Sequence, residues 1–127
     1  MTTLFKRGEF ISHSGKLLPY KIDCDALTNE DIECIADIIA SKVEFGVVQG
    51  IPRGGCRLAN ALEKHINTPD APFQILIVDD VCTTGASFEK AKAEQPPQVH
   101  PDDVVGYVIF ARGKLPDWVK AVFTVNE

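Results

Sequence analysis

Long apolar runs are missing from this chain of 127 residues, although apolar residue types make up 45% of it. No segment approaches the roughly 20 apolar residues of a membrane-spanning helix, so we expect no membrane contact. The N-terminus lacks the apolar core of a secretory signal peptide, which predicts a cytoplasmic protein. Internal repeats and low-complexity segments are also absent. The length then predicts one globular domain over residues 1–127 with a core of its own.

Positive charge is scarce and scattered. Thirteen Lys and Arg residues stand against eighteen Asp and Glu residues, for a net charge of −5, and no basic run occurs. Binding of nucleic acid through a broad basic surface is therefore not expected. The four cysteines show no CxxC spacing, and the three histidines do not cluster with them. A disulfide framework or a Cys/His metal site is not expected either.

Strand-like and helix-like segments alternate along the chain. A Ser14-Gly15 turn between two apolar-patterned runs predicts a β-hairpin over residues 9–23. Thr28, with an acid three residues later, indicates a capping box that opens a helix. The pattern predicts helices over 29–41, 56–65 and 88–94, and strands over 45–49, 73–78, 104–111 and 121–125. This order is typical of an α/β fold with a mostly parallel central sheet, flanking helices and right-handed crossovers.

The most informative segment runs from Ile75 to Ser87. Four apolar residues form a short buried strand, Asp79 and Asp80 stand where it should end, and a hydroxyl-rich turn opens the next helix. Such a turn offers backbone N–H groups, hydroxyls and the helix dipole to a phosphate. The two acids suit sugar hydroxyls, so a ribose 5-phosphate fits. The alternative is an ordinary strand end followed by a helix cap without a ligand.

A second strand-to-helix junction lies at residues 50–55, Gly-Ile-Pro-Arg-Gly-Gly. Its glycines permit close backbone approach, and Arg53 can fork onto an anion. In a parallel sheet this loop and the Asp79-Asp80 segment emerge at the same edge, so one ligand could bridge them. A glycine-rich connection with a surface arginine is the alternative.

Together these motifs resemble the type I phosphoribosyltransferases, which bind phosphoribosyl pyrophosphate (PRPP). The resemblance implies that Asp79 and Asp80 bind the ribose hydroxyls, act in catalysis and contact Mg²⁺ directly or through water. Two binding segments follow from the same resemblance. The 5-phosphate segment is Val81, Cys82, Thr83, Thr84, Gly85, Ala86 and Ser87; the pyrophosphate segment is Ile51, Pro52, Arg53, Gly54 and Gly55.

The N-terminal segment His13 to Tyr20 is similar to that of orotate phosphoribosyltransferases, in which it forms a hood over the base. The resemblance thus divides the chain into a hood-like hairpin, 1–28, and a core, 29–127. It also implies base contacts from His13, Lys16 and Arg112, although His13 stands where the pattern has lysine. An exposed hairpin histidine and a solvated Arg112 at a strand end are the alternatives. Trp118 is expected to pack beneath the turn near Arg112.

One departure from the family concerns the interval between the two loops. Only residues 56–78 separate Gly55 from Asp79. In the family this interval is longer and includes another strand and a flexible loop that closes over the substrate and excludes water. The resemblance therefore implies a trimmed version of the fold. Residues 95–101 or a neighbouring subunit could cover the site instead.

The leading hypothesis is an enzyme that transfers ribose 5-phosphate from PRPP to a nitrogenous base, such as orotate or another nucleobase, and releases pyrophosphate. The resemblance implies Mg²⁺ as cofactor, small-molecule substrates, a role in nucleotide salvage and a homodimer. The alternative is a non-catalytic protein that binds PRPP or a nucleotide and serves as a sensor, a scavenger or a partner-binding module. A third possibility is a reaction in which water replaces the base.

Overall fold

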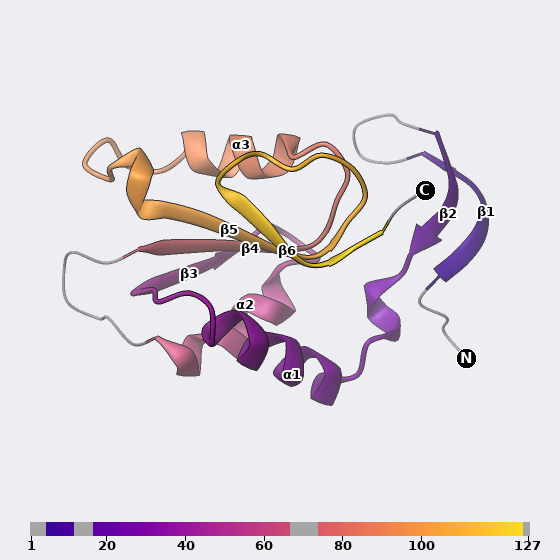
Figure 1. Ribbon diagram of the computed structural model, residues 1–127, viewed down its shortest axis with the longest axis horizontal. Helices are drawn as coiled ribbons and strands as arrows, with labels where there is room; N and C mark the ends of the chain where they lie inside the picture. The colour runs from indigo at the N-terminus through magenta and orange to yellow at the C-terminus, as the bar shows by residue number, and fades with distance from the viewer. Residues whose placement is uncertain (1–4, 12–16, 67–73, 126–127) are drawn as a thin grey trace.

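The computed structural model describes residues 5–11, 17–66 and 74–125, with side chains from residue 22 onward. No helix in these ranges is long and apolar enough to cross a membrane. The elements, in chain order, are β1 (Phe5–Ile11), β2 (Leu17–Ile22), η1 (Cys24–Ala26), α1 (Asn29–Ala40), β3 (Val47–Gly50), α2 (Cys56–Leu62), η2 (Glu63–His65), β4 (Ile75–Cys82), α3 (Ala86–Ala93), η3 (Pro101–Asp103), β5 (Val104–Ala111) and β6 (Val119–Thr124), where η marks a 3-10 helix (Figure 1).

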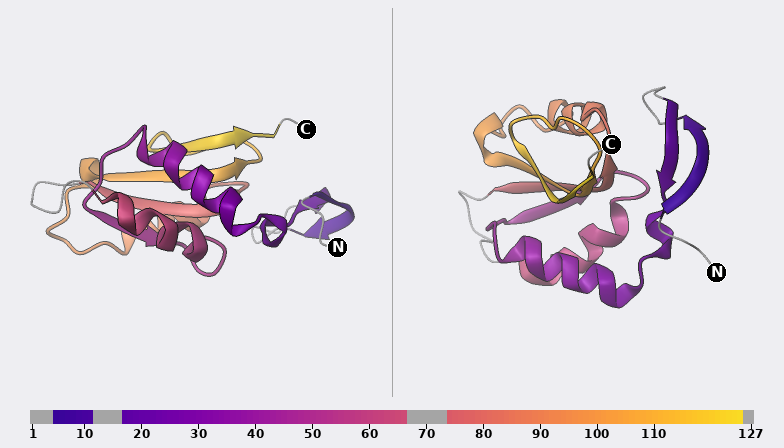
Figure 2. Two further views of the ribbon diagram at one scale, coloured as in Figure 1. Left: turned by 90° about the horizontal axis from the view of Figure 1, so that it is seen from below. Right: turned by 45° about the vertical axis from the view of Figure 1, so that its right-hand side comes forward.

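The expected N-terminal hairpin is confirmed. β1 pairs with β2 in antiparallel register, with an irregularity between Arg7 and Phe10. The predicted turn, with His13 and Lys16, lies outside the described residues. The hairpin stands apart from the main sheet, beside the ends toward which the sheet strands point (Figures 1 and 2).

Helix α1 begins where the sequence predicts. The Thr28 hydroxyl accepts a hydrogen bond from the Asp31 N–H at 3.0 Å, and the Asp31 carboxylate accepts one from the Thr28 N–H at 2.8 Å. This reciprocal capping box satisfies two backbone donors that a helix start otherwise leaves unpaired. The buried face of α1 consists of Ile32, Ile35, Ala36 and Ile39.

The main sheet has the order β3-β4-β5-β6, and all neighbouring pairs are parallel. β5 has the predicted bounds. β4 is longer than expected, because Val81 pairs with Phe110 and Cys82 pairs with Ala111. Both acids and the residues at 81 and 82 therefore belong to the strand. The prediction that β4 ends at Val78 is wrong, since pairing with a full-length neighbour extends it.

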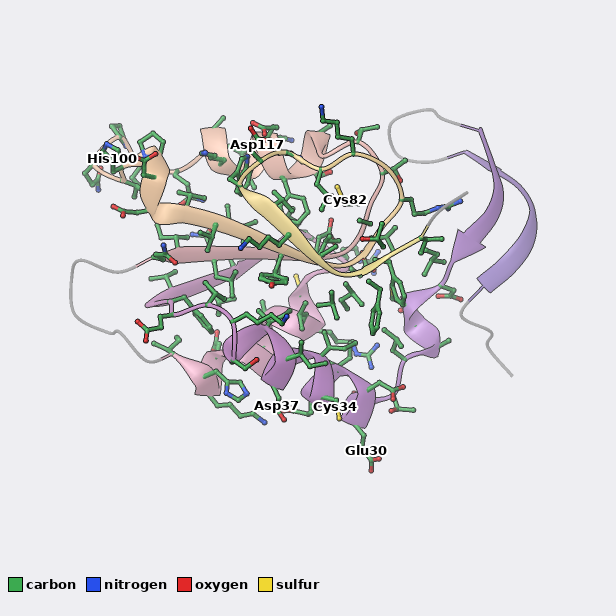
Figure 3. All side chains as sticks on the ribbon, viewed as in Figure 1. Glu30, Cys34, Asp37, Cys82, His100 and Asp117 are labelled. Atoms are coloured by element: carbon green, nitrogen blue, oxygen red, sulfur yellow. The ribbon has the colours of Figure 1, made fainter. Side chains whose placement is uncertain are left out.

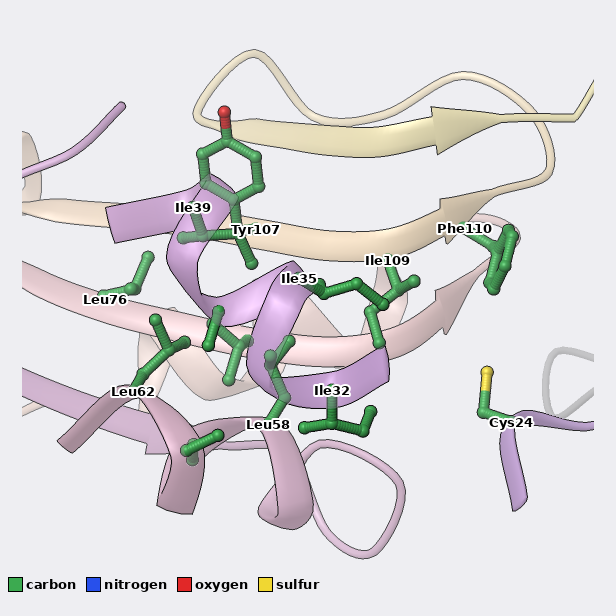
Figure 4. Close-up of a cluster of buried hydrophobic side chains, with 14 of the residues drawn as sticks. Cys24, Ile32, Ile35, Ile39, Leu58, Leu62, Leu76, Tyr107, Ile109 and Phe110 are labelled. Carbon is green, nitrogen blue, oxygen red and sulfur yellow. The ribbon is translucent and has the colours of Figure 1, made fainter. Parts of the chain in front are cut away.

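Two apolar layers sandwich the sheet. Leu76 and Val78 of β4 pack with α1 and α2 in one cluster, part of which is drawn in Figure 4. Ile75 and Ile77 face the other side, where they pack with Phe88 of α3. Phe45, which the sequence placed in β3, precedes that strand and is fully buried at 0% exposure. The alternation of β4 residues between two layers makes it the buried centre of the sheet.

The crossovers on the two faces differ in hand. The steps from β3 to β4 and from β4 to β5 advance in the same direction across the sheet, yet α2 and α3 lie on opposite faces. Two such connections cannot share one hand. The left view of Figure 2 looks at the sheet from the side of α1 and α2. When this view is turned so that the strands point up, β4 lies to the left of β3. A connection through a helix on the viewer's side that moves to the left is left-handed, so β3-α2-β4 is left-handed.

The expectation of right-handed crossovers is therefore wrong for this connection, although about 98% of such units follow it. Burial explains the exception. β4 is apolar on both faces and has to lie between two strands, whereas β3 carries the exposed Gln49 and suits an edge. A right-handed turn through α2 would place the next strand beyond β3, at the edge where no described strand lies.

Candidate active site

The ends of β3 and β4 bring the two predicted loops together. These strands are parallel neighbours with Gly50 opposite Val78, so the segments that follow both emerge at one edge of the sheet. The Ile51 N–H donates to the Val78 carbonyl at 2.9 Å, which continues the pairing into the first loop. The expectation that both loops lie at the same edge is confirmed.

The loop after β3 folds tightly on itself and on β4. The Gly55 N–H donates to the Ile51 carbonyl at 2.8 Å, and the Pro52–Arg53 peptide is cis. A side chain on Gly50 would come within 2.5 Å of the Gly55 carbonyl oxygen, and one on Gly55 would collide with the Val78 carbonyl. Glycine is therefore required at both positions by close backbone packing. Arg53 is exposed beside this fold.

Asp79 and Asp80 are both partly buried, and each folds back on the chain. The Asp80 N–H donates to Asp79 Oδ1 at 2.8 Å, and the Val81 N–H donates to Asp80 Oδ1 at 2.7 Å. The Asp80 carboxylate also lies against Gly54, where a side chain would come within 2.5 Å of its Cγ. One of the two acids is thus in contact with the loop after β3.

The pKa of Asp79 is raised from 3.8 to about 8. Burial is the largest cause, because it penalises the charged carboxylate. The side-chain hydrogen bond to Asp80 and the negative charge of Asp80 raise the pKa further, while the Asp80 N–H lowers it. When it is protonated, Asp79 can donate to a hydroxyl as well as accept from one.

The turn into α3 begins at Thr83 and has Gly85 at its bend. Gly85 has φ of 84° and is the N-cap of α3, a conformation that glycine adopts without strain. Thr84 Oγ1 accepts from the Ala86 N–H at 3.4 Å, and the side chains of Thr84, Ala86 and Ser87 are exposed. The other N–H groups of the first helical turn have no partner within the helix. This geometry suits an anion.

Val81 and Cys82, predicted to wrap the 5-phosphate, lie in β4 and precede the turn. The Cys82 side chain is buried between β4 and α3 (Figure 3), and burial raises the pKa of its thiol. All four cysteines lie in the described ranges as free thiols; Cys24 and Cys82 are buried, and Cys34 and Cys56 are exposed.

Of the three predicted base contacts, only Arg112 is described. Its side chain is 3% exposed, so the alternative of a solvated arginine is wrong. The backbone N–H of Arg112 donates to the Cys82 carbonyl at 2.8 Å, which fixes the chain at the end of β5. Trp118 was expected to be a packing residue, and it packs against Phe88 of α3.

The carboxylates at the end of β4 offer oxygen donors of the kind that Mg²⁺ prefers. The described residues contain no group of three or more His, Cys, Asp or Glu side chains that could hold a metal ion. Two adjacent acids therefore fit an ion that takes most of its ligands from substrate oxygens and water, and they do not fit a closed protein site.

Two residues near the site were not predicted from the sequence. Arg57 of α2 donates to the Leu27 carbonyl at 2.7 Å and to the Cys24 carbonyl at 3.4 Å, so it ties the helix after the first loop to the chain leading from the hairpin. Burial raises the pKa of Cys24 to about 12, with the Asp80 charge as the next cause. Neither residue belongs to a local pattern, so no signal in the sequence marks them.

No family model matches the sequence. The orotate phosphoribosyltransferase of Staphylothermus marinus is 34% identical over 113 residues, covering 69% of this chain and 56% of the relative. That of Sulfurisphaera tokodaii is 30% identical over 110 residues, covering 66% and 56%. The chain thus spans little more than half the length of these relatives.

Solved structures extend the likeness to the fold. Orotate phosphoribosyltransferase from Aeropyrum pernix aligns with a TM-score of 0.68 and 20% identity, covering 96% of this chain and 88% of that one. The Mycobacterium tuberculosis enzyme aligns at 0.61 and 17%, covering 95% and 89%. The architecture agrees with these structures in fold. The chain is a shortened relative of the type I phosphoribosyltransferases.

Proposed function

We propose that the chain binds PRPP and transfers its ribose 5-phosphate to a nitrogenous base, with release of pyrophosphate. The contact between the Asp80 carboxylate and Gly54 carries this proposal. It joins the ribose-binding acids to the pyrophosphate loop, so one ligand with a phosphate at each end can span the site. The names of the relatives, all orotate phosphoribosyltransferases, support the same reaction class.

Each segment has a separate task in this proposal. Arg53 and the backbone of Gly54 neutralise the leaving pyrophosphate, while Gly55, whose N–H donates to the Ile51 carbonyl, closes the loop around it. Asp79 and Asp80 hold the ribose hydroxyls and orient the reacting carbon. The backbone and hydroxyls of residues 83–87 hold the 5-phosphate. Fixing both ends of PRPP positions the reacting carbon, which lowers the entropic part of the activation barrier.

Mg²⁺ belongs to this proposal, held by Asp79 and Asp80 directly or through water. When bound, it would supply charge neutralisation of the pyrophosphate oxygens. His13, Lys16 and Arg112 are proposed to contact the base. A cytoplasmic homodimer is proposed with them, on the resemblance alone; analytical ultracentrifugation would test the dimer.

The test is pyrophosphate release from PRPP and Mg²⁺ with a panel of bases that includes orotate. Release that depends on one base is expected. The double variant Asp79→Asn/Asp80→Asn should lose PRPP binding; binding equal to the unaltered protein would overturn the ribose assignment. A chain that binds neither PRPP nor a nucleotide contradicts the proposal as a whole.

A second candidate is a non-catalytic protein that binds PRPP or a nucleotide. The short interval between Gly55 and Asp79 favours it, since the strand and closing loop of the longer family members have no room there. Phosphate binding needs only the two loops, whereas catalysis also needs water to be excluded. Calorimetry that detects PRPP binding, together with no turnover for any base, would support this candidate. PRPP consumption without a base would indicate that water replaces the base.

A further inference from the structure

The phosphate turn at residues 83–87 packs against the connection between β5 and β6. A side chain on Gly85 would come within 2.6 Å of Pro116 Cδ and 2.7 Å of its Cγ. A side chain on Gly113 would come within 2.9 Å of the Thr83 carbonyl oxygen. The ring of Pro116 and the backbone at Gly113 therefore form a wall behind the turn, and the left-handed conformation of Gly85 fits against it.

Trp118 anchors that wall to α3 and β5. Its Nε1 donates to Glu89 Oε1 at 2.8 Å, and its ring meets Phe88 edge-on with the ring centroids 5.8 Å apart. Lys92 Nζ lies 4.8 Å from the ring centroid. Gly106 leaves space for the ring on β5, because a side chain there would come within 3.1 Å of Trp118 Cζ3. The indole is thus held from several sides.

The backbone transmits this anchoring to Pro116. The Val119 N–H donates to the Pro116 carbonyl at 3.0 Å, and the Gly106 N–H donates to the Trp118 carbonyl at 3.0 Å. Phe88, whose ring contacts the indole, is 1% exposed and belongs to the first turn of α3. Wall, helix and phosphate turn therefore form one packed unit.

We propose that Pro116 and Trp118 are positioning residues that hold the phosphate turn ready for a phosphate monoester. This inference rests on the proposed function, because it concerns the same 5-phosphate site. A turn that is already ordered binds an anion without the entropy cost of arranging its N–H groups. Neither residue touches the ligand; they act through Gly85 and α3. The wall begins directly after Arg112, so the proposed base contact and the phosphate turn share one support.

The test separates the two ends of the ligand. Trp118 is the only tryptophan, so its fluorescence can follow titrations with ribose 5-phosphate and, separately, with pyrophosphate. Pro116→Ala removes the ring atoms that meet Gly85. It should weaken ribose 5-phosphate binding about tenfold, the size expected when one segment has to be ordered on binding. Pyrophosphate binding should change less than twofold. Pro101→Ala, at the exposed start of η3, is the matched control.

A second readout needs no ligand. Amide hydrogen exchange at residues 83–87 should be faster in Pro116→Ala than in the unaltered protein, with no change in β5. Glu89→Ala, which removes only the acceptor of the indole N–H, should show the same pattern to a smaller degree. Unchanged exchange, or equal losses for ribose 5-phosphate and pyrophosphate, would overturn the inference. If the unaltered protein binds neither ligand while exchange rises, the proposed function fails, and only the ordering of the turn by Pro116 is supported.

Discussion

The carboxylate of Asp80, near the end of β4, lies against Gly54 in the loop after β3. The two residues are far apart in the sequence but belong to neighbouring parallel strands. Because no side chain separates them, one ligand can contact both the acid proposed to bind ribose and the loop proposed to bind pyrophosphate. This contact also makes the loop sensitive to the smallest possible substitution.

Gly54→Ala should weaken PRPP binding by about tenfold or more, since a forced displacement of packed groups costs about 1–3 kcal/mol. The new Cβ would come within 2.5 Å of Asp80 Cγ, so the loop or the acid has to move. Isothermal titration calorimetry measures the loss. Cys56→Ala, which alters an exposed neighbour in the same segment, is the control and should bind normally. Normal binding by Gly54→Ala would mean that the loop does not take part.

The pKa of Asp79 predicts a pH dependence of stability. Its value of about 8 in the folded protein lies above its ordinary value of 3.8, so folding favours the protonated acid. The stabilisation is complete below about pH 4, declines as the pH rises toward 8, and changes no further above that. Relative to Asp79→Asn, the free energy of unfolding should therefore fall across this range. Urea unfolding with EDTA present measures it; parallel curves for the two proteins would contradict the assignment.

Local patterns in the sequence predicted those features that depend on neighbouring residues. The Thr28–Asp31 capping box, the bounds of β5 and the placement of the two loops that follow β3 and β4 need only short-range information. The end of β4 could not be predicted this way. Its last residues extend because β5 supplies partners at Phe110 and Ala111, and nothing near Asp79 in the sequence shows how far that neighbour reaches.

The hand of the β3-α2-β4 connection could not be predicted from the sequence for a related reason. Statistics favour a right-handed crossover, whereas the burial of β4 on both faces favours the left-handed one. The contact of Pro116 with Gly85 was missed as well. It joins a turn to a loop from another part of the chain, and a proline in a turn carries no information about which glycine it will cover.

Arg57 should couple the hairpin to the core. Its guanidinium donates to the carbonyls of Cys24 and Leu27, in the segment that leads from β2 to α1. Because the side chain is exposed, Arg57→Ala should lower the free energy of unfolding by only about 0.5–1.5 kcal/mol. The hairpin should nevertheless become more accessible to a protease. Limited proteolysis followed by mass spectrometry tests this. Arg57→Lys keeps the charge but loses the forked guanidinium, so its cleavage rate should lie between those of the unaltered protein and Arg57→Ala. Cleavage unchanged in both variants would count against the coupling.

Arg53 should discriminate between the two ends of PRPP. Its exposed guanidinium stands beside Gly54, and a charged hydrogen bond to an anion contributes about 1.5–3 kcal/mol. Arg53→Ala is therefore expected to weaken pyrophosphate binding about tenfold or more and to leave ribose 5-phosphate binding within about twofold. Lys42→Ala removes an equal charge after α1 and should affect neither ligand. The Arg53 effect should shrink as salt is added, because exposed charges are screened. Equal losses for both ligands would instead indicate a general effect of net charge, and the assignment of this loop to pyrophosphate would then be wrong.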